Sequence, residues 1–335
     1  MASHLKDIGE RAAIELVHGR LGRTADLGGG EDDCAAIPLG DGRLLLATTD
    51  VLIGATHIIP GVTPEALGRF AVEVAVSDVA AMGGRPIGVL CALGLPPSTD
   101  SRWLASLSRG MARAAGGHAT TIVGGDTKSA PVPTLAMTAL GTVEEARCLY
   151  RRGARVGDAL VLTGPVGGPG VGFQRLRERR GWAASGHRAA IGLIYGITAR
   201  VEDGLALAAS GHAHACIDLS DGLGPALHQL MGASGRGARV RWDDLPLARG
   251  LLATAGRARV ARTYLALHFG GEYELLAAVD PAHVDDVLAA VRAARPGARP
   301  MVIGLVTRGH QILLELEGPA VPIGPEGYDH FRGHP

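Results

Sequence analysis

The sequence lacks the features that would tie the protein to a membrane or a nucleic acid. Its 33 basic residues are matched by 33 acidic ones, so the formal net charge is +0 and there is no excess positive charge to attract a polyanion. Nowhere do about 18 apolar residues run together, and residues 1–14 contain no apolar signal core. We therefore expect a soluble, globular, cytoplasmic protein with no membrane or nucleic-acid partner.

Cysteine is scarce and scattered. The sequence contains Cys34, Cys91, Cys148 and Cys216, with no C-x-x-C pair among them. This spacing argues against a cysteine-based zinc site, a redox motif and a disulfide framework, and it is typical of a reducing compartment.

Lysine is almost absent, since Lys6 and Lys128 are the only two. The abundance of arginine has two explanations, a GC-rich genome or a need for guanidinium groups, and we favour the first. No G-x-x-x-x-G-K-[ST] element exists, which excludes a P-loop enzyme. The glycine-rich stretch 164–172 follows a predicted strand and can cradle an anion. It lacks a well-placed G-x-G-x-x-G and the acidic residue expected about 20 positions later, which disfavours a dinucleotide-binding fold.

The length of 335 residues predicts two domains, because single cores usually stop growing near ~250–300 residues. Short apolar runs predict strands at 44–48, 120–123, 159–163, 215–219, 274–279 and 301–306. Helical spacing predicts helices at 64–82, 103–115, 224–231 and 282–294. The alternation indicates an α/β or α+β fold. A polar, glycine-bearing segment at 151–158 predicts a boundary between an N-terminal domain, 1–150, and a C-terminal domain, 151–335.

Aspartates gather beside the predicted strands, where loops converge and ligands bind. They are Asp33, Asp50, Asp126, Asp218 and Asp221. Asp78 differs, because it lies on the apolar stripe of helix 64–82, where a buried carboxylate needs a partner such as a cation. Oxygen-only ligand sets suit Mg2+ serving nucleotide phosphates. The carboxylates therefore predict a magnesium site.

Each of these residues also has an ordinary structural explanation. Asp221 before Gly222 is common turn chemistry, and Asp218 or Ser220 can cap the helix that follows. His57 is one of 13 histidines, and Tyr328 taken alone is only an aromatic residue near the C-terminus. The functional reading rests on several carboxylates occurring together rather than on any one of them.

Taken in order, the motifs resemble the thiamine-monophosphate kinase family, a branch of the PurM-like superfamily named for aminoimidazole ribonucleotide synthetase. The matching segments are Asp32-Asp-Cys-Ala-Ala36, Thr48-Thr-Asp50, Ala75-Val-Ser-Asp-Val-Ala-Ala-Met-Gly83, Gly124-Gly-Asp-Thr127, Arg151-Arg-Gly-Ala-Arg-Val-Gly-Asp158, Ile217-Asp-Leu-Ser-Asp-Gly-Leu223, Gly270-Gly-Glu272 and Gly327-Tyr-Asp-His-Phe331. They run over nearly the whole chain.

The resemblance implies a two-domain PurM-like fold, a homodimer whose N-terminal sheets form a barrel, and a cleft between the domains for ATP, several Mg2+ ions and thiamine monophosphate. It implies as magnesium ligands Asp33, Thr48, Thr49, Asp50, Asp78, Asp126, Asp218 and Asp221. It implies as ATP contacts Gly125, Asp126, Arg151 and Ser220, and as substrate contacts His57, Glu272 and Tyr328. The implied activity is direct in-line transfer of the γ-phosphoryl group to thiamine monophosphate, with no catalytic base.

Two features bear on alternatives. The family's Gly-Gly-Glu-Asp-Tyr-Glu is shortened here to Gly270-Gly-Glu-Tyr-Glu274, which leaves room for a different phosphorylated acceptor. Relatives on the same scaffold include a cyclo-ligase, a selenophosphate synthetase and a hydrogenase-maturation dehydratase. The last two use a cysteine at one end of the chain, which this sequence does not have. A non-catalytic nucleotide-binding relative should have lost some carboxylates.

Overall fold

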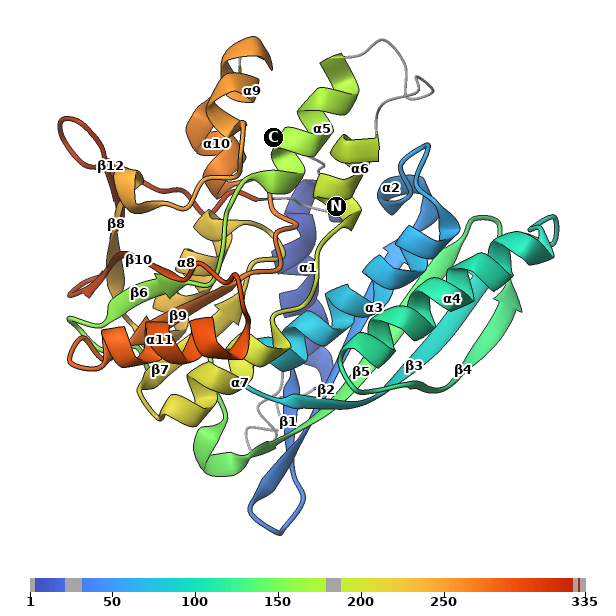
Figure 1. Cartoon of the computed structure of the whole chain (residues 1–335), viewed down its shortest axis with the longest axis horizontal. Helices are drawn as coiled ribbons and strands as arrows, with labels where there is room; N and C mark the ends of the chain where they lie inside the picture. Colours follow the sequence, from blue (N-terminus) through green and yellow to red (C-terminus); the bar gives the residue numbers. More distant parts are fainter. Residues whose placement is uncertain (1–3, 22–31, 179–187, 259, 328–330, 332–335) are drawn as a thin grey trace.

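The computed structural model describes residues 4–21, 32–178, 188–258, 260–327 and 331. Its two sheets lie side by side, each with helices packed on it (Figure 1). The strands up to residue 144 form one sheet, and those from residue 159 onwards form the other. Helix α1, Leu5–Leu21, precedes both, and no helix among the described residues is long and apolar enough to cross a membrane.

The N-terminal sheet has the strand order β1-β2-β5-β3-β4. Its strands are β1 (Ala35–Pro38), β2 (Arg43–Ile53), β3 (Arg85–Leu95), β4 (Ile122–Ser129) and β5 (Thr134–Glu144). The β3–β4 pair is parallel, and the other pairs are antiparallel. The short helix α2 (Gly54–His57) follows β2 directly.

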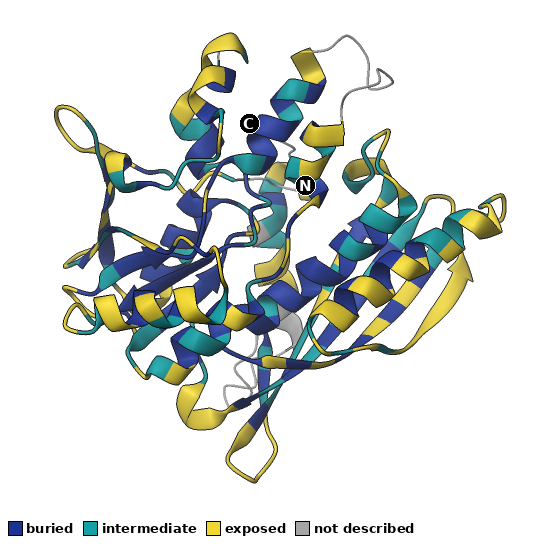
Figure 2. Cartoon of the chain, viewed as in Figure 1, coloured by how far each residue is buried: buried dark blue, intermediate teal, exposed yellow. Residues whose placement is uncertain are grey.

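Helices α3 (Pro64–Ala81) and α4 (Ser101–Gly117) cover one face of this sheet (Figure 1). The two helices pack closely because glycines face each other's backbone. A Cβ at Gly68 would lie 2.1 Å from the carbonyl oxygen of Leu107, and one at Gly110 would lie 2.0 Å from that of Glu65. Helix α3 is buried along most of its length (Figure 2), so its side chains, Asp78 included, face the sheet and the second domain.

The C-terminal sheet has the order β12-β11-β8-β10-β6-β9-β7. Its strands are β6 (Ala159–Leu162), β7 (Ala213–Asp218), β8 (Gly237–Arg241), β9 (Leu275–Val279), β10 (Met301–Thr307), β11 (Ile312–Glu315) and β12 (Val321–Pro322). The helices of this half are α5 (Gly168–Glu178), α6 (Arg188–Tyr195), α7 (Val201–Ser210), α8 (Leu223–Ser234), α9 (Leu251–Ala258), α10 (Arg262–Leu267) and α11 (Val284–Ala294). Strand β9 lies between β6 and β7 and is buried at every position.

The segment before α7 joins the two halves. Tyr195, Ile197, Ala199 and Val201 pack into the core under the N-terminal sheet, although they follow the predicted boundary by more than 40 residues. Leu149 in turn packs in a cluster with α7, α11 and β9. The two halves therefore share apolar cores, which fixes the geometry of the region between them.

Two strand predictions were too short, and the error changes the position of two aspartates. Strand β2 continues to Ile53 because it pairs with β5 as far as Thr134, so Asp50 lies inside the strand rather than at its end. Strand β4 begins at Ile122 and runs on to Ser129, which places Asp126 inside a strand as well. Helix α5 begins at Gly168, inside the glycine-rich stretch 164–172 that follows β6.

Candidate active site

Carboxylates from both halves of the chain meet between the two sheets. Oxygen atoms of Asp33, Asp78 and Asp218 lie within 4.8 Å of one another. Asp33 precedes β1, Asp78 lies on α3, and Asp218 ends β7. Residues separated by up to 185 positions in the sequence thus form one group, and its members come from both halves of the chain.

Hydrogen bonds fix the orientation of these carboxylates. The Thr48 hydroxyl donates to Asp78 Oδ2 at 2.6 Å, and the Ser77 hydroxyl donates to Asp218 Oδ2 at 2.7 Å. Arg151 forms an ion pair with Asp33, with Nη2 to Oδ1 at 2.8 Å. Arg151 Nε also donates to Asp33 Oδ2 at 3.3 Å, so Arg151 contacts both oxygens of Asp33. Asp78 and Asp218 each retain an oxygen that these donors do not use, and the group can still accept further ligands there.

Burial and neighbouring charges raise the pKa values of Asp50, Asp78 and Asp218. Burial, then the charges of Asp221 and Asp33, raise the pKa of Asp50 to about 6. Burial and Asp33 raise the pKa of Asp218 to about 8, and burial with Asp50 and Asp218 raises that of Asp78 well above its usual range. Neighbouring like charges and lost hydration both disfavour the ionised form.

The donor set fits a hard divalent cation. All its atoms are carboxylate or hydroxyl oxygens, the ligands that Mg2+ and Ca2+ prefer. Oδ2 of Asp50 is buried without a hydrogen-bond partner among the described residues. A buried, unpartnered carboxylate oxygen is costly, and a bound cation would satisfy it while neutralising the neighbouring charges.

Two other predicted ligands, Thr49 and Asp126, lie on the opposite face of the N-terminal sheet. Thr48 and Asp50 point towards α3, whereas Thr49, between them, points outwards and shares a 2.8 Å hydrogen bond with Thr138. Asp126 is paired in register with the exposed Ala92 and forms an ion pair with Lys128 at 3.1 Å. Three strand spacings separate β4 from β2, on the order of 14 Å. The structure does not bring Gly125 and Asp126 into the carboxylate group.

The segment Gly270–Glu274 borders the group on the C-terminal side. Gly270 and Gly271 have φ of 82° and 85°, and a Cβ at Gly270 would lie 2.6 Å from the carbonyl oxygen of Ser220. The amide of Gly271 donates to that oxygen at 2.7 Å, and the amide of Tyr273 donates to the Leu219 carbonyl at 3.0 Å. These bonds hold Ser220, which is exposed, beside the shortened glycine motif.

Glu272 is buried in this segment with only one of its oxygens satisfied. Oε1 accepts from the Gly167 amide at 2.9 Å, while Oε2 has no partner among the described residues. Burial raises the pKa of Glu272 to about 7, although the Gly167 amide opposes that shift. The carboxyl group can therefore donate or accept a hydrogen bond near neutral pH, as a contact to a buried ligand requires.

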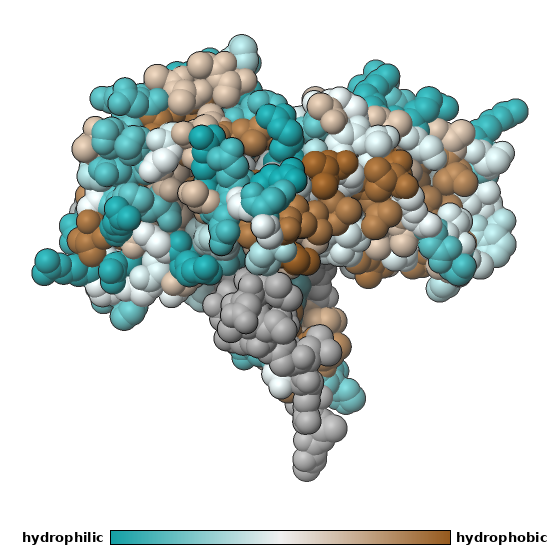
Figure 3. All heavy atoms as spheres, turned by 90° about the horizontal axis from the view of Figure 1, so that it is seen from below, coloured by the Kyte–Doolittle hydropathy of each residue, from teal (hydrophilic) through white to brown (hydrophobic). Residues whose placement is uncertain are grey.

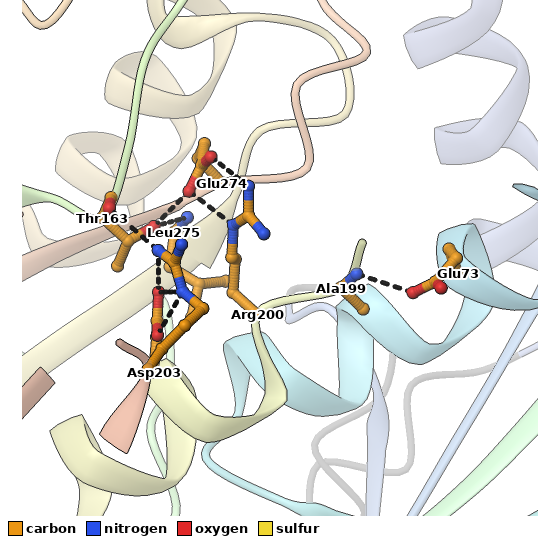
Figure 4. Close-up of polar contacts among 8 residues, drawn as sticks. Glu73, Thr163, Ala199, Arg200, Asp203, Glu274 and Leu275 are labelled. Carbon is orange, nitrogen blue, oxygen red and sulfur yellow. Dashed lines mark hydrogen bonds and ion pairs between the residues drawn. The ribbon is translucent and has the colours of Figure 1, made fainter. Parts of the chain in front are cut away.

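A polar network beneath this segment holds it in place (Figure 4). Glu274 accepts from Arg200 Nε at 2.7 Å and from the Thr163 hydroxyl at 2.8 Å. Arg295 donates to Asp203, with Nη2 to Oδ2 at 2.7 Å. Asp203 and Glu274 are thus each matched by a guanidinium group, whereas in the group of Asp33, Asp78 and Asp218 it is Asp33 that forms an ion pair, with Arg151, among the described residues.

His57 lies at the end of α2, on the N-terminal side of the same region. Its backbone carbonyl accepts from the Tyr195 hydroxyl at 2.6 Å, and that hydroxyl accepts from the Ile59 amide at 2.9 Å. Tyr195 therefore ties the His57 loop to the segment before α7. Tyr328, the third predicted substrate contact, lies outside the described residues.

Three side chains at this site were not singled out from the sequence. Arg200 and Tyr195 act on partners that are 74 and 138 positions away, so no local pattern marks them. Tyr273 lies in the left-handed region, with φ of 51°, and its ring meets Phe70 of α3 edge-on at 6.0 Å. The signal in the sequence that could have identified Tyr273 is its position inside the shortened glycine motif, Gly270–Glu274.

Two family models match most of the chain. The model described as "AIR synthase related protein, N-terminal domain" matches residues 31–143, and that described as "AIR synthase related protein, C-terminal domain" matches residues 155–316. The fold and the shared carboxylate site therefore define a two-domain protein of the AIR-synthase-related, PurM-like class.

More specific relatives narrow this class. The chain is 35% identical to a thiamine-monophosphate kinase of Halobacterium salinarum over 96% of its own length and 99% of the relative's. It is 31% identical to one of Synechococcus elongatus over 98% of both chains. A solved structure described as "AaThiL complexed with AMPPCP and TMP" superposes with a TM-score of 0.82, at 27% identity, over 98% of this chain and 99% of the other. The chain belongs to the thiamine-monophosphate kinase family.

Proposed function

We propose that the protein transfers the γ-phosphoryl group of ATP to thiamine monophosphate and releases thiamine diphosphate and ADP. The observation that carries this proposal is the group of Asp33, Asp78 and Asp218, contributed by both halves of the chain and linked by charge to Asp50 and Asp221, in a member of this family. The related solved structure described as "AaThiL complexed with AMPPCP and TMP" has the same fold. AMPPCP is an analogue of ATP, and TMP is the abbreviation of thiamine monophosphate.

The metal ligands that we propose on the inner side, between the two sheets, are five carboxylates and one hydroxyl group. The carboxylates are Asp33, Asp50, Asp78, Asp218 and Asp221, and the hydroxyl group is that of Thr48. Thr49 and Asp126 would serve from the outer face of the sheet. Bound Mg2+ would neutralise the triphosphate and the charge that develops during transfer. The protein's own part is to hold these oxygens in fixed positions through Ser77 and Thr48.

We propose that Arg151 exchanges its present partner for the nucleotide. In the described chain its guanidinium group contacts Asp33, and Gln229 Oε1 accepts from Nη1 at 2.7 Å. An arginine side chain can bind phosphate with the same fork of donors. Ser220, Gly125 and Asp126 complete the proposed ATP contacts.

The acceptor needs no base to activate it. Its attacking oxygen belongs to a phosphate group and is already anionic, so the new bond to the γ-phosphorus forms as the bond to the bridging oxygen of ADP breaks. The residues proposed to position the acceptor are His57, Glu272 and Tyr328. Oε2 of Glu272 has no hydrogen-bond partner among the described residues, so it is available to bind the acceptor through a hydrogen bond or an ionic contact. Catalysis then rests on positioning.

We further propose a homodimer in the cytoplasm, with residues 1–150 forming the dimerising Mg-ATP domain and 151–335 completing the cleft. Val51, Ile53, Ile87, Leu90 and Val123 leave apolar side chains exposed on β2, β3 and β4. Figure 3 shows hydrophobic residues gathered on the side of the molecule that the N-terminal half forms. Burying this face against a second copy would remove it from water. All four cysteines are free thiols, as in a reducing compartment.

A product assay tests the reaction. Purified protein with ATP, Mg2+ and thiamine monophosphate should form thiamine diphosphate and ADP in equal amounts, and omission of either substrate should stop both. A panel of other phosphate monoesters serves as the specificity control. ADP formed only with another acceptor would replace thiamine monophosphate as the substrate, and absence of any turnover would favour a non-catalytic nucleotide-binding relative.

A further inference from the structure

A second group of metal-ligating side chains lies at the opposite end of the C-terminal sheet from the active site. Its members are His212, Asp280 and His283. His212 immediately precedes β7, whose other end carries Asp218. The strand spans five residue steps, or about 16 Å. This group is therefore separate from the site proposed for ATP and thiamine monophosphate.

The main chain holds the three residues together. The amide of Asp280 donates to the carbonyl of His212 at 3.0 Å, which extends the β7–β9 pairing by one residue. The amide of His283 donates to the carbonyl of Asp280 at 3.0 Å, and His283 is the N-cap residue of α11. Three backbone segments, the α7–β7 turn, the end of β9 and the start of α11, thus meet at one point.

Their side chains also converge. One ligating atom from each residue lies within 4.8 Å of the other two, and the two imidazole rings are stacked with centroids 3.6 Å apart and planes 13° from parallel. Asp280 Oδ1 accepts from the Ala282 amide at 2.9 Å, which fixes the carboxylate and leaves Oδ2 for another ligand. All three residues are half-buried, so solvent reaches the group.

The ionisation states suit a cation. The Ala282 amide, and then the nearby imidazoles of His283, His214 and His212, lower the pKa of Asp280, so its carboxylate is charged. Neutral histidine and ionised aspartate are the forms that bind metal.

We propose that His212, Asp280 and His283 bind one zinc-class divalent cation, with water completing its coordination. Two nitrogens and one oxygen are typical ligands of Zn2+, Ni2+ and Co2+, whereas Mg2+ prefers oxygen alone. The rings must turn from their stacked arrangement to point at a common ion about 2.0–2.1 Å away. Rotation about the terminal torsion of histidine is broad, and both rings are partly exposed. The ion would fasten α11 and β9 to the start of β7.

The test is calorimetric titration of Zn2+ into the full-length, EDTA-stripped protein, with excess Mg2+ present to occupy the oxygen-only site. We compare wild type with His283→Ala and Asp280→Asn, and use His310→Ala as the matched control, since His310 is an exposed histidine on the β10–β11 turn outside the group. Each group variant should lose one Zn2+ equivalent or bind it at least about 10–100-fold more weakly, the loss seen when even an outer partner of a zinc ligand is removed. The control should titrate as wild type.

Co2+ gives a second readout that does not depend on stability. Wild type and His310→Ala should show the visible absorption of a nitrogen-ligated, low-coordinate Co2+, and both group variants should lack it. Unfolding temperatures in EDTA show whether a variant still folds, and Asp280→Asn retains the acceptor for the Ala282 amide. Equal Zn2+ stoichiometry and affinity in wild type and both folded group variants would overturn the proposal, as would a Co2+ spectrum of a fully hydrated ion.

Discussion

The two faces of the N-terminal sheet hold predicted metal ligands in opposite surroundings. On the inner face, Asp50 and Thr48 point at α3, and Asp78, Asp33 and Asp218 crowd against them. On the outer face, Thr49 pairs with Thr138 and Asp126 with Lys128, both in contact with solvent. Predicted ligands that are adjacent in the sequence, such as Thr49 and Asp50, therefore differ in burial and in charge.

The inner and outer predicted ligands differ in how they affect the stability of the fold. The inner carboxylates oppose folding when no cation is bound, because burial and mutual repulsion both disfavour their charges. The outer pair imposes no such cost, since an exposed ion pair contributes little either way. A protein keeps a destabilising buried cluster when a ligand needs it, so the inner face marks the functional site more strongly than the outer one.

The largest effect is expected from Asp78→Asn. Turnover at saturating ATP and Mg2+ should fall at least about 100-fold, the scale associated with losing one electrostatic contact to a transition state. The unfolding temperature in EDTA should be no lower than that of wild type, because the amide is neutral, like the protonated carboxyl group that burial favours, and still accepts from Thr48. Steady-state kinetics measure the turnover, and calorimetry measures the unfolding temperature. Near-wild-type turnover, or a clear loss of stability, would show that Asp78 is structural.

A second effect appears in the pH dependence of stability without metal. Asp50 and Asp218 have folded pKa values of about 6 and about 8, above the value near 3.9 of an unfolded aspartate. The folded chain therefore binds more protons than the unfolded one, and stability must fall as pH rises from about 4 through these values. Glu272, at about 7, adds to the slope.

Calorimetric unfolding in EDTA between pH 5 and pH 8 measures this slope. Asp218→Asn should flatten it, because the variant cannot take up the proton that the folded wild type holds. Mg2+ should also flatten it, since a bound cation favours the ionised carboxylates. Stability that rises with pH in the metal-free wild type would contradict the description of the inner group.

The sequence predicted best where a local pattern decides the structure. The helix expected at 64–82 is α3, Pro64–Ala81, because Pro64 suits its first turn and Thr63 caps it through the Ala66 amide. The position of Asp78 on the apolar stripe followed from helical spacing and is confirmed by its contact with Thr48. The PurM-like fold and the kinase family, expected from the ordered motifs, are also confirmed.

The sequence predicted less where strand pairing decides. Which face Thr49, Asp50 and Asp126 occupy depends on the length and register of β2 and β4, and these are fixed by β5 and β3 rather than by local sequence. The hold of Arg200 on Glu274 is likewise set by packing between distant segments. The roles of the individual site residues, Tyr328 included, stay predictions.

Asp126→Asn sharpens the comparison by testing the outer face alone. If Asp126 binds the metal-nucleotide complex, its loss should lower kcat/KM for ATP by at least about 10-fold, since charge-assisted contacts contribute about 1.5–3 kcal/mol. Stability in EDTA should change little, because the side chain is exposed and paired with Lys128, and an asparagine oxygen can still accept from the Thr127 amide, which donates to Asp126 Oδ1 at 2.8 Å. Lys128→Met is the matched control, since it breaks the same ion pair and spares the carboxylate. Unchanged kinetics in Asp126→Asn would confine the site to the inner face.

The smallest effect is expected at the end of β2, where the inner face meets the segment before α7. Tyr195→Phe removes the hydroxyl that donates to the His57 carbonyl and accepts from the Ile59 amide. Because the aromatic ring and its edge-on contact with Phe70 remain, only the position of the His57 loop should loosen. We expect kcat/KM for thiamine monophosphate to fall by roughly 0.5–1.5 kcal/mol, or about 2- to 12-fold, mainly through KM.

His57→Ala should raise the KM for thiamine monophosphate further. The double variant should add little to this effect, since Tyr195 acts by positioning the His57 side chain, which His57→Ala has already removed. A fall in kcat at unchanged KM would instead place His57 among the groups that act on the transition state.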